Sequence, residues 1–170
     1  MNFLVPKKRE ESVLDIDFFR LKRMGFEAIY LDIDNTFLRR GQTVPDLDFR
    51  QVVGFLPRLF STVLISNTII RSKAERAEKI GSIVSAPVVC CSFLNRKPKS
   101  WGYEEARRIT GIPFDKSVMI GDQLFTDILG ANRLGIYTIH VSPLGPDIWF
   151  SYFTLRRLRE KRILDRLATE

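Results

Sequence analysis

The chain has 170 residues, of which 45% are hydrophobic and 28% are charged, and its formal net charge is +7 at pH 7. This composition excludes a disordered chain, and no apolar run approaches the roughly 20 residues that a membrane-spanning helix needs. We therefore expect a single domain over residues 1–170. The positive charge favours an anionic partner, which could be nucleic acid, an anionic membrane surface or a phosphorylated substrate.

The start of the chain predicts a helix rather than a targeting segment. The first basic residues are not followed by an apolar stretch, and several acidic residues come soon after them. We therefore predict neither a signal peptide nor a transit peptide. Ser12, followed three residues later by Asp15, resembles a capping box and predicts a helix over about 12–24 that ends at Gly25.

Strands and helices then alternate along the chain. Apolar runs that contain β-branched residues predict five strands, at residues 28–33, 62–65, 87–91, 117–120 and 136–141. The stretches between them predict four helices, at residues 47–60, 71–80, 100–109 and 124–134. Gly81, Gly111 and Gly135 are predicted to end the last three helices. This alternation predicts an α/β protein in which βαβ units form a central parallel sheet that is buried on both faces.

Polar residues follow four of the predicted strands at their carboxyl ends, where the reactive crevice of an open parallel sheet lies. They are Asp32, Asp34 and Thr36 after the first strand, Ser66 and Asn67 after the second, Lys97 shortly after the third, and Asp122 and Asp127 after the fourth. Each set has a role in phosphoryl transfer, which needs an in-line nucleophile, charge neutralisation and a proton donor.

The aspartates of this group predict a magnesium site. Alternation along an extended segment places Asp32 and Asp34 on the same side, so both can face one ligand. A bound cation relieves the repulsion between carboxylates this close together. Oxygen ligands without a nearby histidine or cysteine favour Mg²⁺ over zinc. We expect Asp32, Asp34 and Asp122 to bind the metal, with Asp127 orienting the shell behind them.

The remaining polar residues are suited to bind phosphate. Ser66 and the backbone amide of Asn67 can donate hydrogen bonds to phosphoryl oxygens, and Lys97 can neutralise the charge that develops there. Taken singly these residues are weak signals, and Asp127 also fits an ordinary residue in the first turn of a helix. A calcium-binding EF-hand loop does not fit, because Phe37 and Thr43 stand where glycine and glutamate would be needed.

The order of these motifs resembles the haloacid-dehalogenase-like (HAD) phosphatase superfamily. The resemblance implies a Rossmann-like fold in which Asp32 is the nucleophile that forms an aspartyl-phosphate. It also implies that Asp34 is the general acid and then the base that activates water. An aspartate two residues after the nucleophile, followed by Thr36, is typical of the phosphatases of this superfamily. Thr36 and Asp127 would support the site.

The spacing of the motifs is similar to that of the capless members, known as subclass III. Only about ten residues separate Thr36 from the next predicted helix, and 31 positions separate Ser66 from Lys97, which leaves no room for a cap domain. The closer resemblance is to the YqeG group of bacteria and to mitochondrial and plastid phosphatidylglycerophosphate phosphatases. It rests on five stretches, at residues 12–17 with Leu21, 31–36, 65–67, 96–98, and 121–127 with 132–135.

This resemblance implies a magnesium-dependent phosphatase, a phosphoric monoester hydrolase, that removes phosphate from phosphatidylglycerophosphate. An uncapped site agrees with a substrate whose head group is presented at a bilayer. Two alternatives stay open. One is a soluble phosphatase that acts on a sugar phosphate or a nucleotide. The other is a non-catalytic protein that binds phosphate or magnesium, although such a protein would have no chemical need for both Asp32 and Asp34.

The adjacent cysteines, Cys90 and Cys91, seldom form a disulfide with each other and indicate a reducing compartment. We assign them and His140 to packing. We therefore expect a cytoplasmic protein, with peripheral contact to the inner face of the membrane. Nothing in the sequence indicates the oligomeric state.

The end of the chain, about 148–170, is first aromatic and then basic. The aromatic residues are Trp149, Phe150, Tyr152 and Phe153, and the basic ones are Arg156, Arg157, Arg159, Lys161, Arg162 and Arg166. Two interpretations stay open for this tail. It fits a helix that packs on the domain with a solvated charged face, and it fits an interfacial segment on anionic lipid. No nucleic-acid-binding motif accompanies the charge.

Overall fold

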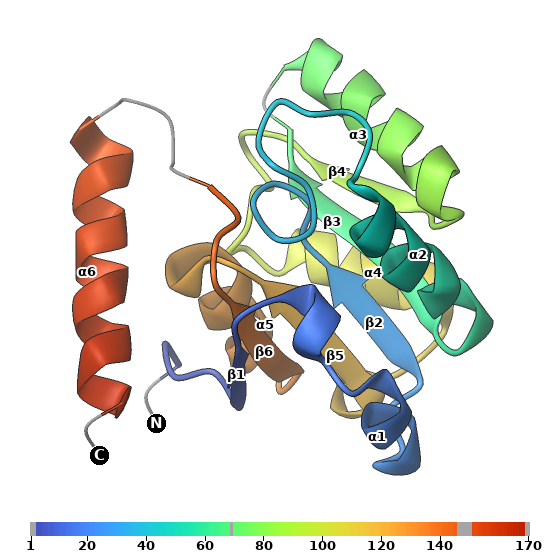
Figure 1. Ribbon diagram of the computed structural model, residues 1–170, viewed down its shortest axis with the longest axis horizontal. Coiled ribbons are helices and arrows are strands. Elements are labelled where there is room, and N and C mark those ends of the chain that lie inside the picture. Colours follow the sequence, from blue (N-terminus) through green and yellow to red (C-terminus); the bar gives the residue numbers. More distant parts are fainter. Residues whose placement is uncertain (1–2, 69, 146–150, 169–170) are drawn as a thin grey trace.

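The computed structural model of the protein describes residues 3–68, 70–145 and 151–168, and the side chains of residues 151–154 and 168 lie outside this description. Six strands form one sheet (Figure 1). They are β1 (Lys8–Glu10), β2 (Ala28–Leu31), β3 (Ser61–Asn67), β4 (Val88–Cys91), β5 (Ser117–Gly121) and β6 (Tyr137–Val141). The strand order is β1-β6-β5-β2-β3-β4, and every neighbouring pair is parallel.

This order reverses direction at the centre of the sheet. From β2 the chain first proceeds outward through β3 and β4, and it then returns to the other side of β2 to form β5 and β6. In open parallel sheets such a reversal leaves a crevice at the carboxyl ends of the two central strands, where ligands bind. The carboxyl ends of β2 and β5 are therefore the expected place for a site.

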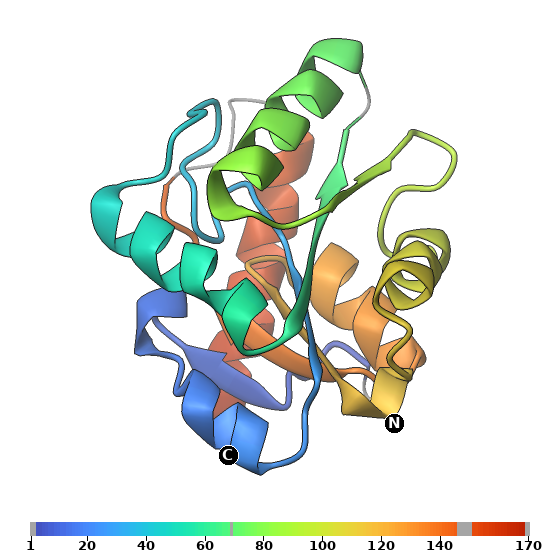
Figure 2. The same cartoon turned by 90° about the vertical axis from the view of Figure 1, so that its right-hand side faces the viewer.

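Helices cover both faces of the sheet (Figure 2). They are α1 (Phe18–Arg23), α2 (Leu47–Phe55), α3 (Arg71–Val84), α4 (Trp101–Thr110), α5 (Leu129–Arg133) and α6 (Ser151–Ala168). Short 3-10 turns occupy Val13–Asp15, Leu56–Arg58 and Phe114–Lys116, and a π-helical turn at Leu124–Ile128 precedes α5. In Figure 2, α2 and α3 lie on one side of the sheet, and α4 and α5 lie on the other.

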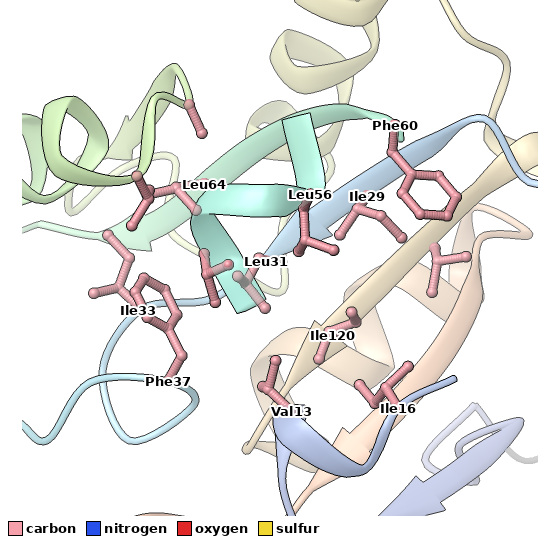
Figure 3. Packing of buried hydrophobic residues seen from close by; sticks show 14 of the residues in the cluster. Val13, Ile16, Ile29, Leu31, Ile33, Phe37, Leu56, Phe60, Leu64 and Ile120 are labelled. Carbon is pink, nitrogen blue, oxygen red and sulfur yellow. The ribbon is translucent and has the colours of Figure 1, made fainter. Parts of the chain in front are cut away.

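Two apolar cores result, one on each face. On the first face Ile29, Leu31 and Ile120 of the sheet pack against Leu56, Phe60 and the N-terminal Val13 and Ile16 (Figure 3). On the second face Tyr30, Val63 and Met119 pack with Tyr103 and Ala106 of α4. Residues that alternate along β2 thus belong to different cores. This explains the continuous apolar sequence of that strand, and the predicted α/β architecture is confirmed.

No predicted strand corresponds to β1, which pairs with β6 at the edge of the sheet. This strand has only three residues, and all of them are charged: Lys8, Arg9 and Glu10. Short, charged strands are typical of sheet edges, where they discourage pairing with other chains. An apolar pattern could not have revealed this one.

Several predicted helix boundaries were wrong. Gly81 does not end its helix, because α3 continues to Val84 and Ser85 takes the left-handed conformation instead, at φ 57°. The predicted helix 12–24 is a 3-10 turn followed by α1, whose first turn is capped by Asp17. The predicted stretches 47–60 and 124–134 each divide into two helical segments. Gly111 and Gly135 do follow helices in the left-handed region, as predicted.

Replacing Gly81 by alanine should destabilise the protein. A Cβ atom there would lie 2.4 Å from Cγ2 of Val88 and 2.7 Å from the carbonyl oxygen of Ala86. Overpacking of this kind costs about 1–3 kcal/mol, whereas alanine improves helix propensity by only about 1 kcal/mol. Gly54→Ala in α2 is the matched control, because a Cβ there meets nothing within 4 Å. Urea unfolding should show a lower midpoint for the first variant only, and equal midpoints would contradict the packing argument.

Candidate active site

The strand ends and the loops that follow them bring the predicted site residues together. Asp32 directly follows β2, Ser66 lies near the end of β3, and Asp122 directly follows β5. Lys97 lies on the loop between β4 and α4. A cavity of about 450 Å³ lies at this edge of the sheet, and its lining includes Asp32, Ser66 and Lys97.

The buried amine of Lys97 is the centre of the site. Its Nζ lies 2.5 Å from Oδ1 of Asp32 and 2.7 Å from Oδ1 of Asp127, and it donates to the carbonyl oxygen of Ile65 at 2.7 Å. The side chain is only 2% exposed. Burial lowers the pKa of Lys97, but the carboxylates of Asp127 and Asp32 more than offset burial and hold this pKa well above its ordinary value. The lysine is therefore charged.

Asn67 fixes the backbone that carries this lysine. The backbone amide of Lys97 donates to Oδ1 of Asn67 at 2.8 Å, and the side-chain amide of Asn67 donates to the carbonyl oxygen of Lys97 at 3.4 Å. The next peptide bond, between Lys97 and Pro98, is cis. The backbone amide of Asn67 was predicted to lie near phosphate, and the structure adds that the Asn67 side chain holds the β4–α4 loop. Ser66 is buried and lines the cavity.

Three buried aspartates are crowded beside the lysine. Asp32, Asp122 and Asp127 each place a carboxylate oxygen within 4.8 Å of the others. Thr36 lies between two of them, because its hydroxyl donates to Oδ2 of Asp32 at 3.2 Å and lies 3.5 Å from Oδ1 of Asp122. Burial raises the pKa of Asp32 to about 6, and burial also raises the pKa of Asp122.

This cluster fits a divalent cation. Its donors are hard carboxylate oxygens, which suit magnesium rather than zinc. A cation would also relieve the cost of crowding buried carboxylates. The cluster consists of Asp32, Asp122 and Asp127, whereas the predicted ligand set was Asp32, Asp34 and Asp122.

Asp34 faces a different partner. Its Oδ1 lies 2.8 Å from Nη2 of Arg76, which comes from α3. The carboxylate still lines the same cavity as Asp32. Between Asp34 and Thr36 the chain turns at Asn35, which adopts the left-handed conformation at φ 64°. The two aspartates thus flank one cavity, although only Asp32 belongs to the buried cluster.

Residues outside the predicted site hold Asp127 in place. Its Oδ2 accepts from the backbone amide of Gln123 at 3.2 Å. Gly121 leaves the space that this side chain needs, since a Cβ atom there would lie 2.6 Å from it. The hydroxyl of Tyr103 donates to the carbonyl oxygens of Thr126 and Asp127, both at 3.0 Å. A buried tyrosine usually needs such a partner. This general rule is the only feature of the sequence that could have pointed to a role for Tyr103 near Asp127.

Helix α6 packs against the same edge of the sheet. Arg157 forms an ion pair with Oδ2 of Asp122 and donates to its carbonyl oxygen at 2.7 Å. Glu160 accepts from the backbone amide of Phe125 at 3.2 Å. Arg156 donates to Oε1 of Gln123 at 2.7 Å. These contacts show that the helical tail packs on the domain, and they show that part of its charge faces the site rather than bulk solvent.

The other residues singled out in the tail and core are placed as follows. Trp149 and Phe150 lie outside the described residues, and so do the side chains of Tyr152 and Phe153. His140 is buried with its Nε2 3.1 Å from the carbonyl oxygen of Asp122, and burial lowers its pKa to about 4. Cys91 belongs to one apolar core and Cys90 packs against the other. Burial raises the pKa of Cys91 to about 11, which makes the thiol unreactive.

Comparison with known proteins connects this geometry with one group of enzymes. Residues 94–143 match the profile of a family described as HAD-hydrolase-like. The probable phosphatase YqeG of Bacillus subtilis (strain 168) is 30% identical over 166 residues, which cover 97% of this chain and 92% of that protein. The chloroplastic phosphatidylglycerophosphate phosphatase 1 of Chlamydomonas reinhardtii is 26% identical over 146 residues. That match covers 82% of this chain but only 53% of the algal protein.

Solved structures share the fold. The putative HAD-hydrolase YfnB of Bacillus subtilis, in a crystal form bound to magnesium, superposes with a TM-score of 0.52 and 13% sequence identity. This match covers 72% of the present chain and 90% of the other. At this level of identity the similarity concerns the fold alone.

We predict that Lys97→Ala, which removes the buried amine, destabilises the protein by about 3 to 5 kcal/mol in EDTA. The substitution leaves buried carboxylates without a counter-charge. The double variant Lys97→Ala/Asp127→Asn should recover part of the loss, since it removes one of those carboxylates. Lys99→Ala, an exposed lysine on the same loop, should change stability by less than about 0.5 kcal/mol. Denaturant unfolding measures all three, and a Lys97→Ala midpoint equal to that of the wild type would contradict the expectation.

Proposed function

Because the chain belongs to the HAD-like phosphatase family that includes YqeG, we propose that it hydrolyses phosphatidylglycerophosphate to phosphatidylglycerol and phosphate, with magnesium bound at the site. The main support for this reaction is the buried cluster in which Lys97 contacts both Asp32 and Asp127. The relative named a phosphatidylglycerophosphate phosphatase supports the choice of substrate.

In the proposed reaction the carboxylate of Asp32 attacks phosphorus and forms an aspartyl-phosphate. The oxygen of the leaving alcohol takes its proton from Asp34, which lines the same cavity. Asp34 then accepts a proton from water as that water attacks the phosphorus of the intermediate. Phosphate departs and the carboxylate of Asp32 is restored. Arg76 holds Asp34 at the wall of the cavity during both steps.

Lys97 and Ser66 bind the transferred group in this proposal. The charged amine of Lys97 neutralises the phosphoryl oxygens, and the hydroxyl of Ser66 and the backbone amide of Asn67 donate to them. Since Asp32, Asp127 and the carbonyl oxygen of Ile65 already fix the amine of Lys97, its positive charge is in place before substrate binds. Thr36 orients Asp32 through the hydrogen bond to its Oδ2.

Asp32, Asp34 and Asp122 are the proposed metal ligands, and Asp127 lies close enough to take part. Magnesium at this position would neutralise phosphoryl oxygens and align them with the nucleophile. Arg157 contacts Oδ2 of Asp122, whereas Oδ1 of the same carboxylate faces Thr36. One oxygen of Asp122 is therefore directed toward the cluster.

The surroundings of the site support a large, anchored substrate. Between Thr36 and α2 the chain forms a loop, and the described residues between β3 and Lys97 form α3, β4 and their connections. Neither segment contains a cap domain. Among the described helices, none combines the length and the apolar character of a membrane span. We propose that the protein meets its substrate by peripheral contact with the inner face of the membrane.

The variant Asp32→Asn should lose turnover on phosphatidylglycerophosphate while it keeps the wild-type fold, because an amide cannot attack phosphorus. Release of inorganic phosphate from mixed micelles measures activity, and circular dichroism measures folding. Asp48→Asn, an exposed aspartate on α2, is the matched control and should be fully active. Turnover by Asp32→Asn at the wild-type rate would exclude Asp32 as the nucleophile. If the wild type hydrolyses only soluble phosphate esters, the lipid substrate is wrong and the phosphatase chemistry stands.

Chelation by EDTA should abolish activity, and added Mg²⁺ should restore it. Calcium should restore it poorly, because it prefers longer bonds and more ligands than the in-line geometry allows. In Asp122→Ala the Mg²⁺ concentration for half-maximal activity should rise at least about tenfold, as is typical when a ligand or its support is lost. Asp115→Ala, whose carboxylate lies at the opposite end of β5, should titrate like the wild type. An unchanged titration in Asp122→Ala would remove this residue from the metal site.

A further inference from the structure

The cavity at the active site has more positive charge than the proposed reaction uses. Its lining contains three carboxylates, Asp32, Asp34 and Asp127, and six cationic side chains, Arg40, Lys73, Arg96, Lys97, Arg156 and Arg159. The excess is three positive charges. Like charges do not gather in one cavity without a cost, so the excess needs an explanation.

The carboxylates of the lining already have partners near the reaction centre. Asp32 and Asp127 both contact Lys97, and Asp34 pairs with Arg76, which does not line the cavity. Arg156 donates to the neutral amide of Gln123. The carboxylates therefore do not account for the cations farther out on the wall of the cavity.

Three of these cations come from separate elements. Lys73 is in the first turn of α3, Arg96 is on the β4–α4 loop next to Lys97, and Arg159 is on α6. All three are exposed, and within the part of the chain that the structure describes none of them forms an ion pair. Arg96 forms a cation–π contact with Phe93, because its guanidinium lies 5.1 Å from the centre of the Phe93 ring.

We propose that Lys73, Arg96 and Arg159 form a second anion subsite, which binds a second phosphate group on the same substrate molecule. The phosphate attacked by Asp32 would be bound by Lys97, and the second phosphate would contact the three outer cations. This proposal rests on the proposed phosphatase function only in that Asp32 marks the reacting end. The second group can be the phosphodiester of a lipid or a phosphate of a soluble bisphosphate, since both present anionic oxygens.

The charge of the cavity agrees with such a substrate. A phosphomonoester dianion would reduce the excess of three positive charges to one, and a divalent cation that binds with it would restore three. With or without the divalent cation, the cavity therefore keeps a net positive charge that can bind a second phosphate. Guanidinium groups suit this task because their planar donors can bind two phosphate oxygens at once.

The test compares substrates that have two phosphate groups with substrates that have one. The lipid pair is dihexanoyl phosphatidylglycerophosphate and dihexanoyl phosphatidic acid, of which only the first has a phosphodiester. The soluble pair is glycerol bisphosphate and glycerol phosphate. For at least one pair, kcat/KM of the wild type should be about tenfold or more higher for the member with two phosphates, as expected for hydrogen bonds to a charged group.

Variants then locate the effect. The triple variant Lys73→Gln/Arg96→Gln/Arg159→Gln should lose this preference mainly through KM. Its activity on p-nitrophenyl phosphate should stay within about twofold of the wild type, because this ester has no second phosphate and a twofold change is smaller than the loss of one hydrogen bond to a charged group. The control variant Lys79→Gln/Arg162→Gln changes exposed cations of the same two helices that do not line the cavity. It should keep the preference.

The outcomes separate this subsite from the proposed function. A triple variant with an unchanged preference, or a wild type with no preference in either pair, would overturn the subsite. Preference for glycerol bisphosphate without hydrolysis of either lipid would support the subsite and exclude the lipid function. Hydrolysis of phosphatidylglycerophosphate with no preference in either pair would support the lipid function and exclude the subsite. Thermal unfolding followed by circular dichroism verifies that each variant is folded.

Discussion

A buried ammonium group between two buried carboxylates is the constraint on which the site depends. Lys97 contacts Asp32 and Asp127 and also donates to the carbonyl oxygen of Ile65 inside β3. Burying a charge costs several kcal/mol, and only close partners in good geometry offset this cost. The ends of β2 and β3, the β4–α4 loop and the segment after β5 must therefore be positioned together. The parallel sheet, with its reversal between β2 and β5, provides this arrangement.

Other residues position the reactive groups without taking part in the proposed reaction. Asn67 holds the backbone on both sides of Lys97, and Tyr103 anchors the carbonyl oxygens around Asp127. Gly121 provides the space for the Asp127 side chain. Tyr103 is fully buried in the core under α4, so the packing of that face and the orientation of Asp127 are connected. A change in the core beneath α4 would be transmitted to the carboxylate cluster, and a site assembled this way tolerates little variation in its supports.

The apolar pattern of buried parallel strands predicted β2 to β6, and the polar residues that follow these strands predicted the convergence of Asp32, Ser66, Lys97 and Asp122. It could not predict β1, whose charged residues have no pattern, or the end of α3, where packing of Gly81 against Ala86 and Val88 overrides the usual preference of glycine for a helix terminus. The contact of Arg157 with Asp122 joins residues 35 positions apart. No local signal distinguishes that arginine from the other basic residues of the tail, and only tertiary structure assigns it to the site.

The pairing of β1 with β6 also determines the order in which the chain can assemble. Lys7 donates its backbone amide to Thr138, and Arg9 donates to the carbonyl oxygen of Leu164, across 131 and 155 positions respectively. A ribosome releases the first ten residues long before either partner exists, and closing such long loops is slow. We therefore expect β2, β3 and β4 to pair while the outer edge of β6 has not yet been made. β1 therefore completes the sheet last, and until it pairs with β6 the edge of β6 is exposed to pairing with other nascent chains.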